Sequence, residues 1–115
     1  MGHRDIFLIE NIIENCEKLS SYLKTNAVGE NDFYENIYHQ DICSFYCLQI
    51  GENANSLSEV FIQNHPGIEW RKIIGFRNVI AHDYGAVDVK ILWDIVNRNI
   101  PELKRFCEKL LQKRI

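Results

Sequence analysis

The sequence predicts an all-α protein, built as an antiparallel four-helix bundle. Apolar residues recur at steps of three and four along most of the chain, which is the spacing of an amphipathic helix face. No segment shows the alternating pattern of a strand, and no internal repeat or low-complexity tract is present. A length of 115 residues with 46% hydrophobic and 25% charged residues suits one globular unit, so we expect residues 1–115 to form a single domain.

The first helix is expected from about Arg4 to Lys24. Its apolar residues form one stripe, made of Ile6, Ile9, Ile13, Cys16 and Leu23 and widened by Ile12 and Leu19. The polar, glycine-containing segment 25–32 then breaks the pattern. A short helical turn around Phe33, Tyr34, Ile37 and Tyr38 is expected to cover the core.

A second long helix is expected from about Asp41 to Gln63. One face of this helix carries Cys43, Cys47, Ile50, Ala54, Leu57 and Phe61. Gly51 lowers the helix propensity, but its small size would permit a neighbouring helix to approach closely. The segment 65–67, His-Pro-Gly, ends the helix.

The third helix is expected to begin at Glu69 or Trp70 and to end near His82, ahead of Gly85. Asp88 is a suitable N-cap for a fourth helix. The inward-facing residues of that helix are Leu92, Ile95, Val96, Asn99, Leu103, Phe106 and Leu110. Pro101 lies inside the pattern, where a proline removes a hydrogen bond and crowds the preceding turn. We therefore expect this helix to kink near residues 97–100, or to restart with Pro101 in its first turn.

The net charge of −3 hides a polarity along the chain. Residues 1–66 hold 3 Lys and Arg against 10 Asp and Glu, a net charge of −7, whereas residues 67–115 hold 10 against 6, a net charge of +4. Near the end of the chain, Glu102 and Glu108 are outnumbered by Arg98, Lys104, Arg105, Lys109, Lys113 and Arg114. This basic stretch is either a footprint for phosphates or the solvated outer face of a helix.

The four cysteines indicate buried free thiols rather than disulfides. Cys16, Cys43, Cys47 and Cys107 all lie in apolar stretches of the expected helices. Cys43 and Cys47 could form half of a metal site, but no nearby His or Cys pair completes it, and we expect no metal and no cofactor.

No apolar run approaches the roughly 20 residues needed to span a bilayer, and the start MGHRD does not have the form of a signal peptide. The expected location is the cytoplasm, with no membrane partner.

Residues 77–84 read RNVIAHDY and gather a cation, a proton-transfer group and a phenol. Arg77 can neutralise a phosphate through two parallel hydrogen bonds, and His82 carries the side chain best suited to proton transfer near neutral pH. RNA supplies its own nucleophile, the 2'-hydroxyl, so these groups can cleave RNA without a metal ion. The structural alternatives are an arginine bound to helix-end carbonyls or a carboxylate, and a histidine that caps a helix end.

The pattern R-x4-H-x-Y, with Asn78 after the arginine, resembles the motif of the HEPN ribonucleases. Residues 69–104, EWRKIIGFRNVIAHDYGAVDVKILWDIVNRNIPELK, are similar to the HepT toxin family of that superfamily. Gly51 in residues 48–54, LQIGENA, matches a further family feature, although Asn53 stands where the family usually has a second small residue. The resemblance implies a HEPN bundle and a ribonuclease with Arg77 and His82 as catalytic residues, supported by Asn78.

The resemblance also implies products, a partner and a form of control. The cleaved RNA would carry 2',3'-cyclic phosphate and 5'-hydroxyl ends. In a HEPN toxin–antitoxin system, an MntA-type minimal nucleotidyltransferase attaches AMP to the motif tyrosine, which is Tyr84 here, unless its ring packs on the bundle instead. The competing interpretation is a non-catalytic HEPN module that binds a nucleotidyltransferase or nucleic acid. Asp83 could hold the imidazole of His82, but adjacency in sequence does not place the two side chains together.

The spacing of the motif residues sets a geometric problem. On one straight helix, Arg77 and His82 would point about 140° apart, whereas Tyr84 would lie about 20° from Arg77. Either the helix loosens before His82, or two copies of the motif face each other and combine their groups. The family resemblance favours the second arrangement, because HEPN ribonucleases form their cleft across a dimer interface. We therefore expect a homodimer.

Overall fold

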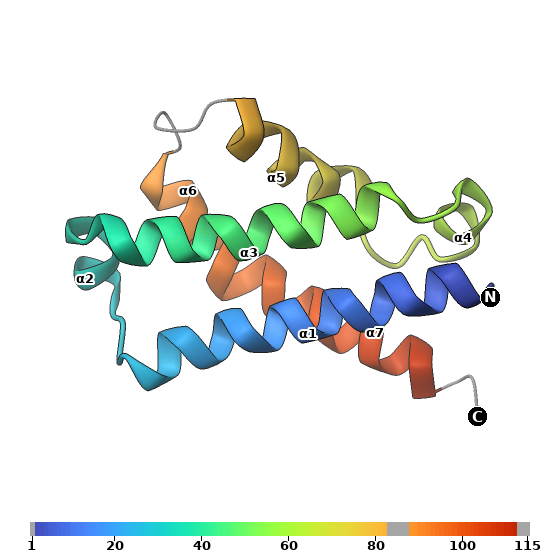
Figure 1. Cartoon of the computed structure of the whole chain (residues 1–115), viewed down its shortest axis with the longest axis horizontal. Coiled ribbons are helices and arrows are strands. Elements are labelled where there is room, and N and C mark those ends of the chain that lie inside the picture. Colours follow the sequence, from blue (N-terminus) through green and yellow to red (C-terminus); the bar gives the residue numbers. More distant parts are fainter. Residues whose placement is uncertain (1, 83–87, 113–115) are drawn as a thin grey trace.

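The computed structural model describes residues 2–82 and 88–112, and within these ranges every regular element is a helix. The predicted all-α class is confirmed. The longer helices are α1 (His3–Thr25), α3 (Ile37–Asn55), α5 (Trp70–His82) and α7 (Ile100–Gln112), and the short ones are α2 (Glu30–Glu35), α4 (Glu59–Asn64) and α6 (Val89–Asp94). Successive longer helices run in alternating directions along the long axis (Figure 1). Within the described ranges no helix is both long and apolar enough to cross a membrane.

The helix α3 lies at the centre of the arrangement. It packs against α1 on one side and α5 on the other, while α7 packs against α1 (Figure 1). The apolar face predicted for the second long helix is confirmed, because its six members are all buried: Cys43, Cys47, Ile50, Ala54, Leu57 and Phe61. From α1, Ile9, Ile12, Cys16 and Leu19 join them with no exposed surface.

The end predicted for the second long helix is wrong. The chain leaves α3 at Asn55, and Ser58 begins the separate helix α4 by accepting a hydrogen bond from the backbone N of Phe61 at 3.1 Å. Leu57 and Phe61 nevertheless stay buried, so the apolar spacing continues through the break. For this reason the sequence pattern did not reveal that the helix ends at Asn55. A buried carboxylate, Asp5 of α1, holds the break by accepting hydrogen bonds from both the backbone N and the Oγ of Ser58.

The start predicted for that helix is also wrong, by four residues. The turn expected around residues 33–38 is divided between two elements: Phe33 and Tyr34 belong to α2, whereas Ile37 and Tyr38 begin α3. Asn36 separates them, because its side chain accepts a hydrogen bond from the backbone N of Tyr38 at 2.9 Å and caps α3.

The later boundaries follow the sequence closely. The helix α5 spans Trp70–His82, and Asp88 caps α6 by accepting hydrogen bonds from the backbone N of Lys90 at 2.9 Å and of Ile91 at 3.5 Å. After α6, residues 95–99 form a turn of π-helix, and α7 then begins with Pro101 in its first turn. The irregularity predicted near residues 97–100 is this π-helical turn and not a separate restart, because Asp94, Ile95 and Ile100 all keep right-handed helical dihedrals and the backbone N of Ile100 donates to the carbonyl O of Ile95. A π-helical turn is one way in which a helix accommodates a local disturbance such as a proline.

Candidate active site

Arg77 lies where α5 comes closest to α3. A Cβ atom added at Gly51 of α3 would lie 2.5 Å from the Cβ of Arg77 and 3.1 Å from its backbone N. Non-bonded heavy atoms do not approach so closely, and only glycine allows the two helices to meet here. The close approach predicted at Gly51 is confirmed, and it fixes the place of the Arg77 backbone.

Glu52, the next residue of α3, binds the Arg77 side chain. The Nε of Arg77 donates a hydrogen bond to Oε1 of Glu52 at 2.5 Å, across 25 residues of sequence. The Arg77 side chain is 30% exposed and that of Glu52 is 48% exposed. The guanidinium is therefore held at the junction of α3 and α5, with part of its surface open to solvent.

The other predicted site residues are placed less completely. The helix α5 continues through His82, so the structure does not show the loosening before His82 that would aim both groups at one phosphate. The backbones of Asn78 and His82 lie on α5, but their side chains, and all of Asp83 and Tyr84, lie outside the described residues. How Arg77 meets Asn78, His82 and Tyr84 therefore stays a prediction.

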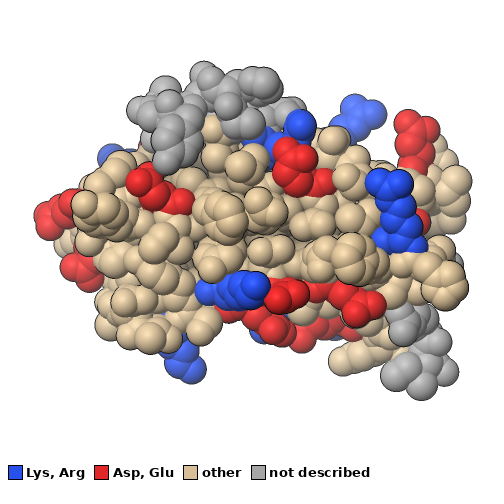
Figure 2. Space-filling view, viewed as in Figure 1, with Lys and Arg blue, Asp and Glu red and all other residues tan. Residues whose placement is uncertain are grey.

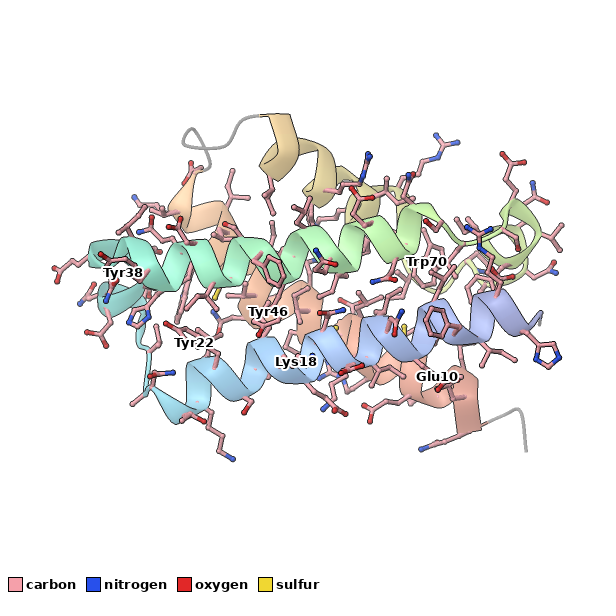
Figure 3. All side chains as sticks on the ribbon, in the orientation of Figure 1. Glu10, Lys18, Tyr22, Tyr38, Tyr46 and Trp70 are labelled. Carbon is pink, nitrogen blue, oxygen red and sulfur yellow. The ribbon has the colours of Figure 1, made fainter. Side chains whose placement is uncertain are left out.

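The outward side of α3 carries an uncharged stripe that leads to Glu52. Four residues at steps of four, three and four form it: Tyr38, Ile42, Phe45 and Gln49. We call these four residues the outer stripe of α3. Tyr38 is 72% exposed and Phe45 is 54% exposed. Figure 2 shows a largely uncharged band along α3, and Figure 3 shows Tyr38 and the neighbouring Tyr46 on this helix.

Charged residues gather elsewhere on the molecule. Glu10, Glu14 and Glu17 are exposed on α1, where Figure 2 shows acidic side chains along one edge. The C-terminal end of α5 lies at the top of Figure 1, whereas that of α7 lies at the lower right. The two helix ends therefore do not adjoin within one chain, and Lys113 and Arg114 lie outside the described residues.

The four cysteines are buried free thiols, as predicted. Burial raises the pKa of Cys43 to about 12 and that of Cys107 to about 12. Burial also raises the pKa of Cys16 and Cys47. These groups are uncharged thiols near neutral pH, and a thiol is a poor metal ligand and nucleophile. The described residues contain no group of three His, Cys, Asp or Glu side chains that could hold a metal ion.

The prediction of the site from sequence missed Glu52. A signal was present, since an acidic residue directly follows the glycine that marks a close helix crossing. The partner could not be predicted, because the sequence does not say which residue of another helix lies opposite Gly51. The contacts of the folded chain identify that residue as Arg77.

Comparison with known proteins places these features in a family. The HepT-like family, described as Ribonuclease HepT-like, matches residues 12–110. A protein of Thermococcus cleftensis named "Probable ribonuclease HepT" is 41% identical over 109 residues, which cover 95% of this chain and 96% of that protein. A protein of Caldanaerobacter subterraneus subsp. tengcongensis named as a putative RNase is 29% identical over 105 residues, 91% of this chain and 92% of its own length. No solved structure matches the chain.

Proposed function

This chain belongs to the HepT-like ribonuclease family, and we propose that it is a metal-independent endoribonuclease that acts in the cytoplasm as the toxin of a toxin–antitoxin system. The observation that carries the proposal is the R-x4-H-x-Y sequence motif, with its arginine on α5 bound at the junction with α3. An arginine–carboxylate pair that only stabilises the fold is the alternative. Partly exposed ion pairs of this kind contribute little to the stability of a fold, so stability alone does not explain why Glu52 binds Arg77.

The reaction that suits these groups is the attack of the RNA 2'-hydroxyl on its own phosphate. A base takes the hydroxyl proton, the oxygen bonds to phosphorus, and the 5'-oxygen leaves with a proton from an acid. His82 serves as the base or the acid, and Arg77 stabilises the negative charge that develops on the phosphate oxygens. Asn78 supports them by orienting one of these groups or the substrate. The products carry 2',3'-cyclic phosphate and 5'-hydroxyl ends.

A homodimer is part of the proposal. Arg77 and His82 lie five positions apart on α5, and positions at that spacing on a regular helix point about 140° apart. We therefore propose that a second copy of the motif completes the site. The outer stripe of α3 suits contact with another copy, because it is uncharged, exposes aromatic rings and ends beside the Glu52–Arg77 pair. The predicted cleft would then lie between two chains.

The proposed antitoxin is an MntA-type minimal nucleotidyltransferase that attaches AMP to Tyr84. Each attached nucleotide adds a bulky base and a phosphodiester charge close to Arg77 in the sequence, which would block the cleft and repel RNA. We expect incubation with this enzyme, ATP and magnesium to add the mass of AMP to the peptide that contains Tyr84.

The matched variants for this modification are Tyr84→Phe and Tyr38→Phe. Tyr38 is 72% exposed and lies outside the motif, so Tyr38→Phe should be modified like the wild type. Mass spectrometry of the digested protein reports the modified peptide. Equal modification and silencing of Tyr84→Phe would show that Tyr84 is not the switch.

The competing function is a non-catalytic helical module that binds a nucleotidyltransferase or nucleic acid. The acidic edge of α1 and the net charge of −3 favour it, since both oppose the approach of RNA to an independent nuclease. Harmless expression of the wild type together with tight binding to the partner would support this reading. Toxicity that requires both Arg77 and His82 would support the toxin.

The deciding experiment is RNA cleavage in excess EDTA by the wild type, Arg77→Ala and His82→Ala. Because general acid–base catalysis contributes about 10²- to 10⁴-fold, His82→Ala should lose nearly all cleavage. Arg71→Ala is the matched control, as it removes an exposed cation from the same helix outside the motif. Full cleavage by both motif variants, or complete loss of wild-type cleavage in EDTA, would exclude the proposed mechanism.

A further inference from the structure

We propose that Glu52 is a positioning residue, which fixes the guanidinium of Arg77 in the orientation that receives the substrate phosphate. This inference rests on the proposed ribonuclease function and adds a residue from a second helix to the site. Glu52 lies on α3, outside the motif, and its carboxylate reaches Arg77 on α5.

The contact engages one defined atom of the arginine. Oε1 of Glu52 accepts the hydrogen bond from Nε, which is the nitrogen nearest the aliphatic part of the side chain. A guanidinium is planar and presents its donors in a rigid fork, so a bond at Nε sets the plane of the whole group. The directions of the remaining N–H groups are then fixed relative to α3.

The backbone beneath this contact is also fixed. Gly51 allows α3 to lie against the backbone of Arg77, with the Arg77 Cα only 3.2 Å from where a Cβ of Gly51 would be. Arg77 is therefore located at both ends, by Gly51 at its backbone and by Glu52 at its head group. An arginine side chain that is held in this way loses less conformational freedom when it binds a phosphate.

The charge of Glu52 makes a positioning role distinguishable from a binding role. A carboxylate beside a phosphate-binding cation repels RNA, so a residue present only as a charge would weaken the binding of substrate. If Glu52 acted only as a charge, its removal would strengthen RNA binding and would not change kcat. Removal of a positioning residue lowers kcat, because misplacement of a catalytic group by about 1 Å can cost about 10²-fold in rate.

The kinetic test compares Glu52→Ala, Glu52→Gln and Glu52→Asp with the wild type. Glu52→Ala removes the acceptor and should lower kcat by about tenfold to hundredfold, with KM unchanged or lower. Glu52→Gln keeps an acceptor oxygen at the same reach and should retain most of kcat. Glu52→Asp keeps the charge but shortens the side chain, and it should resemble Glu52→Ala. The control Glu10→Ala removes one exposed carboxylate from α1 and should match the wild type.

A second measurement does not depend on RNA cleavage. In protein labelled with ¹⁵N-arginine, the Nε–H resonance of Arg77, identified by its absence in Arg77→Lys, should exchange slowly with water in the wild type and in Glu52→Gln. It should exchange quickly in Glu52→Ala. Circular dichroism and thermal unfolding confirm that each variant is folded, which the 48% exposure of Glu52 favours.

The two measurements separate failure of this inference from failure of the proposed function. If the wild type does not cleave RNA, the ribonuclease proposal fails, and the Nε–H exchange by itself decides whether Glu52 holds Arg77. If the wild type cleaves RNA, an unchanged kcat in Glu52→Ala overturns the positioning role. An equal loss of kcat in Glu52→Gln and Glu52→Ala overturns it as well, because charge rather than the hydrogen bond would then be required.

Discussion

Asp5 of α1 accepts two hydrogen bonds from Ser58, which lies 53 residues later in the chain, one from the backbone N at 3.0 Å and one from Oγ at 2.8 Å. The same Oγ accepts the hydrogen bond of the Phe61 backbone N that begins α4. Asp5, a residue with only 9% of its surface exposed, thus fixes where a distant helix starts. It also ties the first turn of α1 to the loop between α3 and α4.

Asp5→Ala should destabilise the protein by roughly 1–3 kcal/mol, because hydrogen bonds to charged groups contribute about that much and Ser58 would lose both of its bonds to the carboxylate. Asp5→Asn keeps one acceptor oxygen and should cost less. Urea denaturation monitored by circular dichroism measures both, with exposed Glu10→Ala as the control. Equal stability of Asp5→Ala and the wild type would contradict this account.

The cysteine thiols offer a second prediction at the scale of single residues. An ordinary pKa of 9.0 would leave a thiol half ionised at pH 9, but burial raises the pKa of Cys43 to about 12. The folded chain keeps its thiol protons where the unfolded chain loses them, so folding stability from these groups is complete below pH 9.0 and declines as pH rises above it.

We expect the folded protein to resist a thiol reagent at pH 9, and the protein in urea to react at all 4 cysteines. The absorbance of the chromophore that the reagent releases gives the number of cysteines that have reacted. Ser21→Cys, at an exposed position of α1, supplies a reactive control in the folded state. Rapid reaction of the native cysteines at pH 9 would show that they are not shielded as the structure has them.

At the scale of helices, two glycines in helix interiors have opposite surroundings. At Gly51 of α3 an added Cβ would meet Arg77, whereas at Gly75 of α5 it would meet nothing within 4 Å. Alanine has the higher helix propensity at both positions, so only the surroundings differ. Gly51 serves the junction of α3 and α5, while Gly75 makes no such contact.

Gly75→Ala should therefore raise the free energy of unfolding by roughly 0.5–1 kcal/mol. Gly51→Ala should lower it by roughly 1–3 kcal/mol through overpacking, and should also reduce RNA cleavage because the Arg77 backbone must move. Urea denaturation of the two variants side by side gives the comparison. Similar changes in both would mean that the helices do not meet at Gly51 as described.

At the scale of the whole molecule, the central prediction is a site shared between two chains. Arg77→Ala and His82→Ala chains should each be inactive alone and should regain part of the activity when mixed, because one of the two sites in a mixed dimer keeps both groups. Exchange of subunits between differently tagged wild-type chains is the control. No recovery despite proven exchange would contradict the shared site.

The surface proposed for this contact can be tested separately. Phe45→Lys places a charge in the outer stripe of α3 and should shift the mass in solution toward the monomer. Phe7→Lys is the matched control, since Phe7 is 61% exposed on α1 outside the stripe. Analytical ultracentrifugation at micromolar concentration reports both, and a Phe45→Lys dimer as stable as the wild type would exclude this surface.

The sequence by itself determined the elements whose signals are local. The start of α5, the Asp88 cap and the irregular turn before Pro101 depend on side chains a few positions away in the chain, and the apolar faces follow from steps of three and four. The motif residues from Arg77 to Tyr84 could be singled out for the same reason, because their chemistry lies within eight consecutive positions.

The tertiary structure alone decided the features that depend on which helix faces meet. The break between α3 and α4 is held by Asp5, and the Arg77 head group is held by Glu52, over separations of 53 and 25 residues. Neither pair can be predicted from periodicity. The spacing of apolar residues indicates that a helix face is buried, but it does not indicate which residues of another helix lie opposite that face. The packing of the helices determines which residues become partners. Glu52, beside Gly51, can bind Arg77 only because α5 packs against α3 at this point.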